Sequence, residues 1–133
     1  MVKRPIDLVP VLVLAVGVSI AAASSGEPTR EGRDFFLKNV VPELAKNGCP
    51  ACHSVGYLRP DVLRYEELLR RLAIGDSAEN NVVIYKLADI RSFTPDRPNH
   101  PGGKRCETVD AEPCATLQAW WRIEFGDTEG SGE

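Results

Sequence analysis

Residues 49–53 read Cys-Pro-Ala-Cys-His and combine two thiols and an imidazole at a fixed spacing. This C-x-x-C-H run is the attachment signature of a c-type haem. Two cysteines at this spacing can add to the two vinyl groups of one porphyrin, and the histidine directly after them can then ligate the iron. We therefore predict that Cys49 and Cys52 form the thioether bonds of one covalent haem c. His53 would be the proximal iron ligand.

The second axial position of such an iron needs another donor, and the sequence offers few. Methionine, a common axial partner of histidine in haem proteins, occurs only as Met1. The only other histidine is His100, in residues 99–103, which read Asn-His-Pro-Gly-Gly. Two glycines let the backbone approach a ring edge without a side-chain clash. We predict that His100 is the distal ligand; the alternatives are Lys104 or a five-coordinate iron.

Three cationic residues flank the predicted ligands in the sequence, namely Arg59, Lys104 and Arg105. Guanidinium and ammonium groups bind carboxylates through charge-assisted hydrogen bonds. These residues are therefore candidates to hold the haem propionates; the alternative, which is the commoner role of such residues, is an ordinary surface charge.

The remaining cysteines, Cys106 and Cys114, form a second pair on the C-terminal side of the His100 loop. In an oxidising compartment the natural interpretation is a disulfide, which would tether this loop to the last helix. The alternative is a zinc site built from these two residues together with Cys49 and Cys52. The histidine directly after Cys52 and the export signal described next both favour haem over zinc.

The N-terminal residues 1–24 resemble a secretory signal peptide. A short basic region is followed by an apolar stretch from Leu8 to Ala23 and by small residues suited to cleavage. The alternative is a retained membrane anchor through residues 5–23, although the apolar stretch is short for a spanning helix. Either case predicts export to the periplasm or to the outer face of the cytoplasmic membrane, where disulfides are stable. Residues 25–33, rich in small and polar residues, are predicted to be a linker.

The periodicity of apolar residues predicts short helices that surround these sites, and no strands. The expected helices run from Asp34 to about Val40, from Pro42 to Asn47, from Asp61 to Gly75, from Ser77 to about Ala88 and from Pro113 to Phe125. Asp61 and Ser77 are the expected N-caps of two of them. Prolines and glycines between residues 91 and 112 exclude a long helix there. The tail, residues 128–133, is predicted to be disordered.

The lead-in to the haem motif resembles that of small cytochrome c-like domains common in planctomycetes and myxobacteria. The resemblance rests on Phe36, Val40, Pro42 and Leu44 at their spacing before Cys49. Several such domains carry a His-x-Gly-Gly loop in which histidine replaces methionine, and His100 with the two glycines after it matches this loop. The resemblance implies an all-α cytochrome c fold over residues 34–127, with four to five short helices around one haem and with the first and last helices crossing.

Composition and charge narrow the functional classes. The chain has a net charge of −3 and no run of lysine or arginine, so nucleic-acid binding has no electrostatic support. We predict an electron-transfer protein rather than an enzyme, with redox proteins as partners. The alternatives are a haem-bearing accessory subunit of a membrane redox complex and a haem sensor or enzyme with an open distal site.

Overall fold

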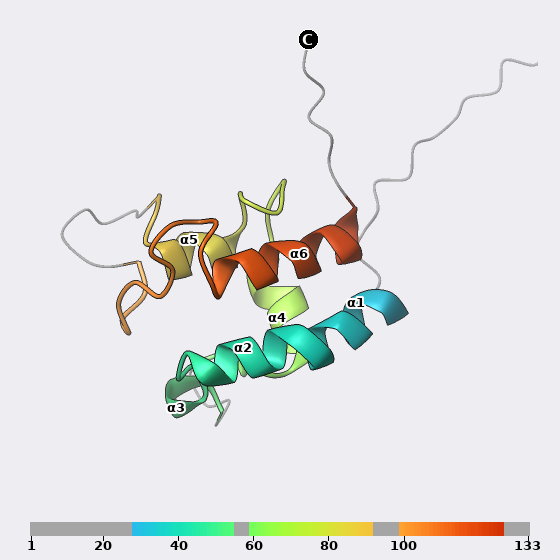
Figure 1. Cartoon of the computed structure of the whole chain (residues 1–133), viewed down its shortest axis with the longest axis horizontal. Helices are drawn as coiled ribbons and strands as arrows, with labels where there is room; N and C mark the ends of the chain where they lie inside the picture. Colours follow the sequence, from blue (N-terminus) through green and yellow to red (C-terminus); the bar gives the residue numbers. More distant parts are fainter. Residues whose placement is uncertain (1–27, 55–58, 92–98, 127–133) are drawn as a thin grey trace, which may run out of the picture.

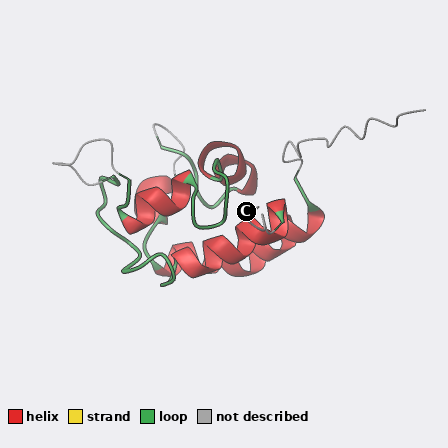
Figure 2. Ribbon diagram, turned by 90° about the horizontal axis from the view of Figure 1, so that it is seen from above, coloured by secondary structure: helices red, strands yellow, loops and turns green. Residues whose placement is uncertain are grey.

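Every regular element that the structure describes is a helix, so the predicted all-α class is confirmed (Figures 1 and 2). The structure, a computed structural model, describes residues 28–54, 59–91 and 99–126. The predicted signal or anchor segment, residues 25–27 of the predicted linker and the tail 128–133 lie outside these ranges. Within them, the one β-type contact is an isolated bridge between Gly75 and Asn81. No helix in the described ranges is both long enough and apolar enough to span a bilayer.

The first helical segment begins earlier than the sequence suggested. Helix α1 (Arg30–Phe35) starts directly after Thr29, whose side-chain oxygen accepts a hydrogen bond from the Gly32 N–H. Residues 30–33 therefore belong to a helix, and the prediction of a linker through residue 33 was wrong for them. The reason is tertiary, because the Thr29 N–H also donates to the Glu124 carboxylate at 2.7 Å, 95 residues along the chain.

Pro42 does not divide this segment into two helices, as the sequence analysis expected. The chain continues from α1 through a π-helical turn, η1 (Phe36–Val40), into α2 (Val41–Lys46). Within the π turn the Val41 N–H donates to the Phe36 carbonyl, five residues back. A proline lacks the N–H of a regular α-turn and its ring clashes with the preceding turn. The wider π turn accommodates both the missing N–H and the ring of Pro42, so the helical segment runs from α1 to α2 without a break.

Four further helices complete the described fold: α3 (Pro50–His53), α4 (Tyr65–Leu72), α5 (Val82–Ala88) and α6 (Cys114–Phe125). Two predicted N-caps were wrong. Asp61 accepts a hydrogen bond from the Leu63 N–H in a turn that precedes α4, and α4 itself starts at Tyr65. Asn81, not Ser77, caps α5, because its side-chain oxygen accepts from the Ile84 N–H.

Helix α6 packs against α1 and η1, so the first and last described helices are in contact (Figure 1). Phe36 lies against Trp120 and against Tyr65, with ring centroids 5.6 Å apart in both pairs. Gly32 permits this close approach, since a β-carbon there would lie 1.7 Å from the Glu124 carboxylate. The aromatic residues of α6 therefore serve the core. Helix α5 lies beyond α6, toward the end of the molecule that carries α2 and α3 (Figure 1).

Candidate functional site

The C-x-x-C-H run forms the one-turn helix α3, directly after the end of α2. Gly48 has a positive φ of 73° and makes the turn between the two helices. The turn is held by hydrogen bonds from the Gly48 N–H to the Ala45 carbonyl and from the Cys49 N–H to the Leu44 carbonyl. Cys49 and Cys52 are both free thiols, and both line the same cavity. The local fold thus presents the two thiols to one space.

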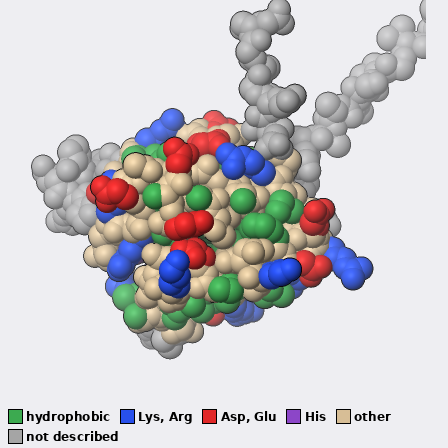
Figure 3. Space-filling model, in the orientation of Figure 1, with side chains coloured by type: hydrophobic (Ala, Val, Ile, Leu, Met, Phe, Trp, Pro, Cys, Tyr) green, Lys and Arg blue, Asp and Glu red, His purple; other side chains and the backbone are tan. Residues whose placement is uncertain are grey.

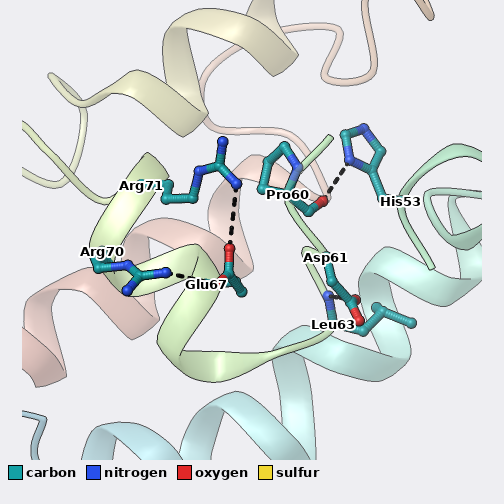
Figure 4. Close-up of polar contacts among 7 residues, drawn as sticks. All are labelled: His53, Pro60, Asp61, Leu63, Glu67, Arg70 and Arg71. Carbon is teal, nitrogen blue, oxygen red and sulfur yellow. Dashed lines mark hydrogen bonds and ion pairs between the residues drawn. The ribbon is translucent and has the colours of Figure 1, made fainter. Parts of the chain in front are cut away.

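His53, at the end of α3, is oriented by a backbone carbonyl. Its Nδ1 lies 2.9 Å from the carbonyl oxygen of Pro60 (Figure 4). A carbonyl oxygen can only accept a hydrogen bond, so Nδ1 carries the proton of the neutral ring. Nε2 then keeps its lone pair. This is the arrangement by which metal-binding histidines are held, with one ring nitrogen donating and the other free to ligate.

His100 is oriented in the same way by its own loop. The His100 Nδ1 lies 3.1 Å from the carbonyl oxygen of Gly103, and the Gly103 N–H donates to the His100 carbonyl at 2.8 Å. Gly103 adopts a φ of 79°, which favours glycine. A β-carbon on Gly102 would lie 2.8 Å from the His100 Cε1. The two glycines therefore shape a turn that closes around the ring and leaves its Nε2 free.

The two imidazoles, 47 positions apart in the sequence, face one space. Their centroids are 5.9 Å apart and their planes differ by 14°. No described residue donates to or accepts from either Nε2. Burial lowers the pKa of His100, and the positive charges of Arg105 and Lys86 lower it further, against the bond to Gly103. This shift favours the neutral ring, the form in which an imidazole ligates a metal.

The thiols and imidazoles lie on the wall of a cavity of about 420 Å³. This volume is in the usual range of about 300–1,000 Å³ for ligand pockets. Helices and loops from three parts of the chain supply its apolar wall: Leu44, Val62, Leu68, Leu72, Val83 and Leu87. The face of the molecule in Figure 3 carries mixed charges and shows no histidine, so the two rings do not open onto that face.

The charged residues on the cavity wall are all cationic among the residues described: Arg59, Lys86 and Arg105. Two of them, Arg59 and Arg105, were candidates from the sequence. Lys104, the third candidate, does not line the cavity. The sequence analysis did not identify Lys86 as a candidate. Lys86 lines the cavity together with its α5 neighbours Val83 and Leu87, because the packing of α5 turns this side of the helix toward the cavity. Burial raises the pKa of the Cys49 thiol, and the nearby Arg105 partly opposes this effect.

Cys106 and Cys114 form a disulfide, with their sulfur atoms 1.98 Å apart and their Cα atoms 5.9 Å apart. Both residues are fully buried. Because these sulfurs are bonded to one another, they cannot join Cys49 and Cys52 in a zinc site, which removes the alternative raised by the sequence. The described ranges contain no cluster of three or more histidine, cysteine, aspartate or glutamate side chains placed to hold a metal ion.

Comparisons of the chain with protein-family models, with curated proteins and with solved structures found no match. The resemblance to small cytochrome c-like domains therefore stays a prediction from the sequence.

Proposed function

We propose that this chain is an exported single-haem c-type cytochrome of the cytochrome c fold, which transfers electrons and has bis-histidine iron ligation. The observation that carries the proposal is the pair of facing imidazoles. His53 and His100 each have Nδ1 committed to a backbone carbonyl, and they lie beside two free thiols on one apolar cavity.

The spacing of the two rings fits a shared metal. An imidazole nitrogen binds a metal at about 2.0 Å, and the ring centroid lies about 1.1 Å behind that nitrogen. Two imidazoles on opposite sides of one metal therefore have centroids about 6.2 Å apart. The separation here is 5.9 Å. The donor set also fits, since two neutral imidazoles are a known axial pair for haem iron.

The other residues of the cavity fit the remainder of the group. Six aliphatic side chains supply apolar contact for a porphyrin face, and Cys49 and Cys52 supply thiols for covalent attachment. Arg59, Lys86 and Arg105 supply positive charge for two propionates. No carboxylate among the described residues lines this cavity to oppose such binding.

When bound, the haem would supply a one-electron redox centre. The chain's own residues would hold it: the Pro60 and Gly103 carbonyls orient the imidazoles, and the aliphatic wall excludes water. With His53 and His100 both as ligands, no iron position is left for a substrate. This favours an electron carrier over a haem enzyme or gas sensor. The Cys106–Cys114 disulfide is in keeping with an oxidising compartment, which supports export. The electron donor and acceptor would be other redox proteins.

The test is to express the full chain with a haem-attachment system and record its optical spectra. We expect haem that acid–acetone cannot extract, a low-spin spectrum and no immediate change when carbon monoxide is added to the reduced protein, only slow binding limited by the departure of His100. The Cys49→Ser, Cys52→Ser double variant should lose the covalent haem. The His100→Ala variant should bind carbon monoxide immediately, whereas Lys104→Ala, the matched control, should bind it as slowly as the wild-type protein.

Each outcome bears on a different part of the proposal. Extractable haem in the wild-type protein would refute covalent attachment. Carbon monoxide binding by the wild-type protein as fast as by His100→Ala would refute the six-coordinate carrier and favour the open-site alternative. An unchanged spectrum in His100→Ala would refute His100 as the ligand. Recovery of the holoprotein only with a membrane complex would favour the accessory-subunit alternative.

A further inference from the structure

We propose that Asn99 is a positioning residue that clamps the His100 loop to the end of α5 and thereby sets how firmly His100 holds iron; this inference rests on the function proposed above. Asn99 directly precedes His100 in the chain, so the backbone position of one constrains the other.

The contacts that hold the His100 ring are internal to its loop. The bond from Nδ1 to the Gly103 carbonyl and the bond from the Gly103 N–H to the His100 carbonyl join residues of a single turn. They fix the ring relative to the turn but not relative to His53. The position of the turn in the molecule must come from contacts that leave it.

Asn99 makes three such contacts, all to the last turn of α5 and the residues just after it. Its side-chain amide donates to the Tyr85 and Ile90 carbonyls, both at 3.0 Å. Its backbone N–H donates to the Asp89 carboxylate at 2.7 Å. The Tyr85 carbonyl also accepts from the backbone N–H groups of Asp89 and Ile90, so Asn99 joins the hydrogen bonds that end α5. A side-chain amide, with two N–H donors, can donate to two carbonyls together.

The other end of the loop is tied to the same helix. The backbone N–H groups of Arg105 and Cys106 both donate to the Leu87 carbonyl, at 2.7 and 3.0 Å. Leu87 also lines the cavity, so α5 is at once the anchor of the loop and part of the cavity wall. The disulfide from Cys106 to Cys114 adds a tether on this downstream side only. On the upstream side, among the residues described, Asn99 makes the contacts that anchor the loop.

The test measures carbon monoxide binding to the reduced holoprotein, because His100 must leave the iron before carbon monoxide can bind. Asn99→Ala removes both side-chain anchors, and we expect the rate of binding to rise about tenfold or more, the effect of losing one or two hydrogen bonds. Asp89→Gly removes the third contact. Asp89 has a φ of 55°, which glycine adopts freely, so this variant should fold well and raise the rate about threefold.

Asn81→Ala is the matched control. Asn81 caps the opposite end of α5, with its side chain bonded to Ile84, Ser77 and Ala78. Removal of the Asn81 side chain should lower the unfolding temperature but leave the position of the His100 loop unchanged. We therefore expect its rate of carbon monoxide binding to stay within about twofold of wild type, although the helix is weakened.

The variants distinguish a failure of the proposed function from a failure of the role proposed for Asn99. A wild-type protein that is low-spin, with His100→Ala binding carbon monoxide freely, supports the proposed function whatever Asn99 does. Given that result, equal rates in Asn99→Ala, Asn81→Ala and wild type would overturn the role of Asn99. If Asn99→Ala yields no folded holoprotein, Asp89→Gly decides: a raised rate supports the clamp, and a wild-type rate overturns it.

Discussion

Gly102→Ala provides a sharp test of how the His100 ring is held. The β-carbon of the new alanine would lie 2.8 Å from the Cε1 and 3.1 Å from the Nδ1 of His100. Carbon atoms in favourable contact are about 3.5–4.0 Å apart, so the ring must retreat by roughly 0.7 Å or more. The guanidinium of Arg105, which would lie 3.1 Å from the new methyl group, ends a flexible side chain and can move aside.

The retreat should cost stability and weaken the bond from Nδ1 to the Gly103 carbonyl. Overpacking of this kind costs about 1–3 kcal/mol. We expect the free energy of unfolding of the holoprotein to fall by that amount, and the low-spin spectrum to be partly lost. Added imidazole should restore the low-spin spectrum, because it replaces a ligand that has been displaced.

The assay is a double-mutant cycle measured by urea unfolding. In the His100→Ala background the ring is absent, so Gly102→Ala should cost almost nothing. The coupling between the two substitutions should therefore be close to the full cost of Gly102→Ala in the wild-type background. An equal cost in both backgrounds would refute the reasoning, since the methyl group would then clash with something other than the His100 ring.

Three further predictions concern the scaffold. Replacing Cys106 and Cys114 by serine should lower the free energy of unfolding by about 2–3 kcal/mol in urea titrations, and an unchanged midpoint would contradict a role in stability. Gly32→Ala, whose β-carbon would lie 1.7 Å from the Glu124 carboxylate, should cost about 1–3 kcal/mol in the same assay, and no loss would disprove the close contact of α1 with α6. Burial, aided by Glu124, raises the pKa of Tyr65 above its usual value of 10.0. The unfolded chain then loses this proton near pH 10 while the folded chain keeps it, so stability should fall as the pH rises beyond 10. Tyr65→Phe should remove that slope, and an unaltered slope would refute the assignment.

Covalent spacing made some of the site predictable. The thiols of Cys49 and Cys52 and the imidazole of His53 lie within one helical turn, so their grouping needs no tertiary information. The apolar faces of the helices could also be predicted, because the spacing of apolar residues along a helix is visible within a short stretch of sequence. Val83, Ile84 and Leu87, which lie at this spacing on α5, are buried. His100 could be named because the sequence contains so few alternative donors, but its place opposite His53 depends on the fold.

What the sequence by itself determined was the all-α class and the residues that could bind haem. The tertiary structure decided which helix ends form and which charges reach the cavity. Thr29 begins a helix because Glu124, remote in sequence, accepts its N–H. Lys86, rather than Lys104, lines the cavity because of how α5 is packed. The physical reason is the same in both cases. A hydrogen bond between distant segments, or a cavity wall that they form together, does not change the spacing of apolar residues in either segment, so neither sequence predicts it.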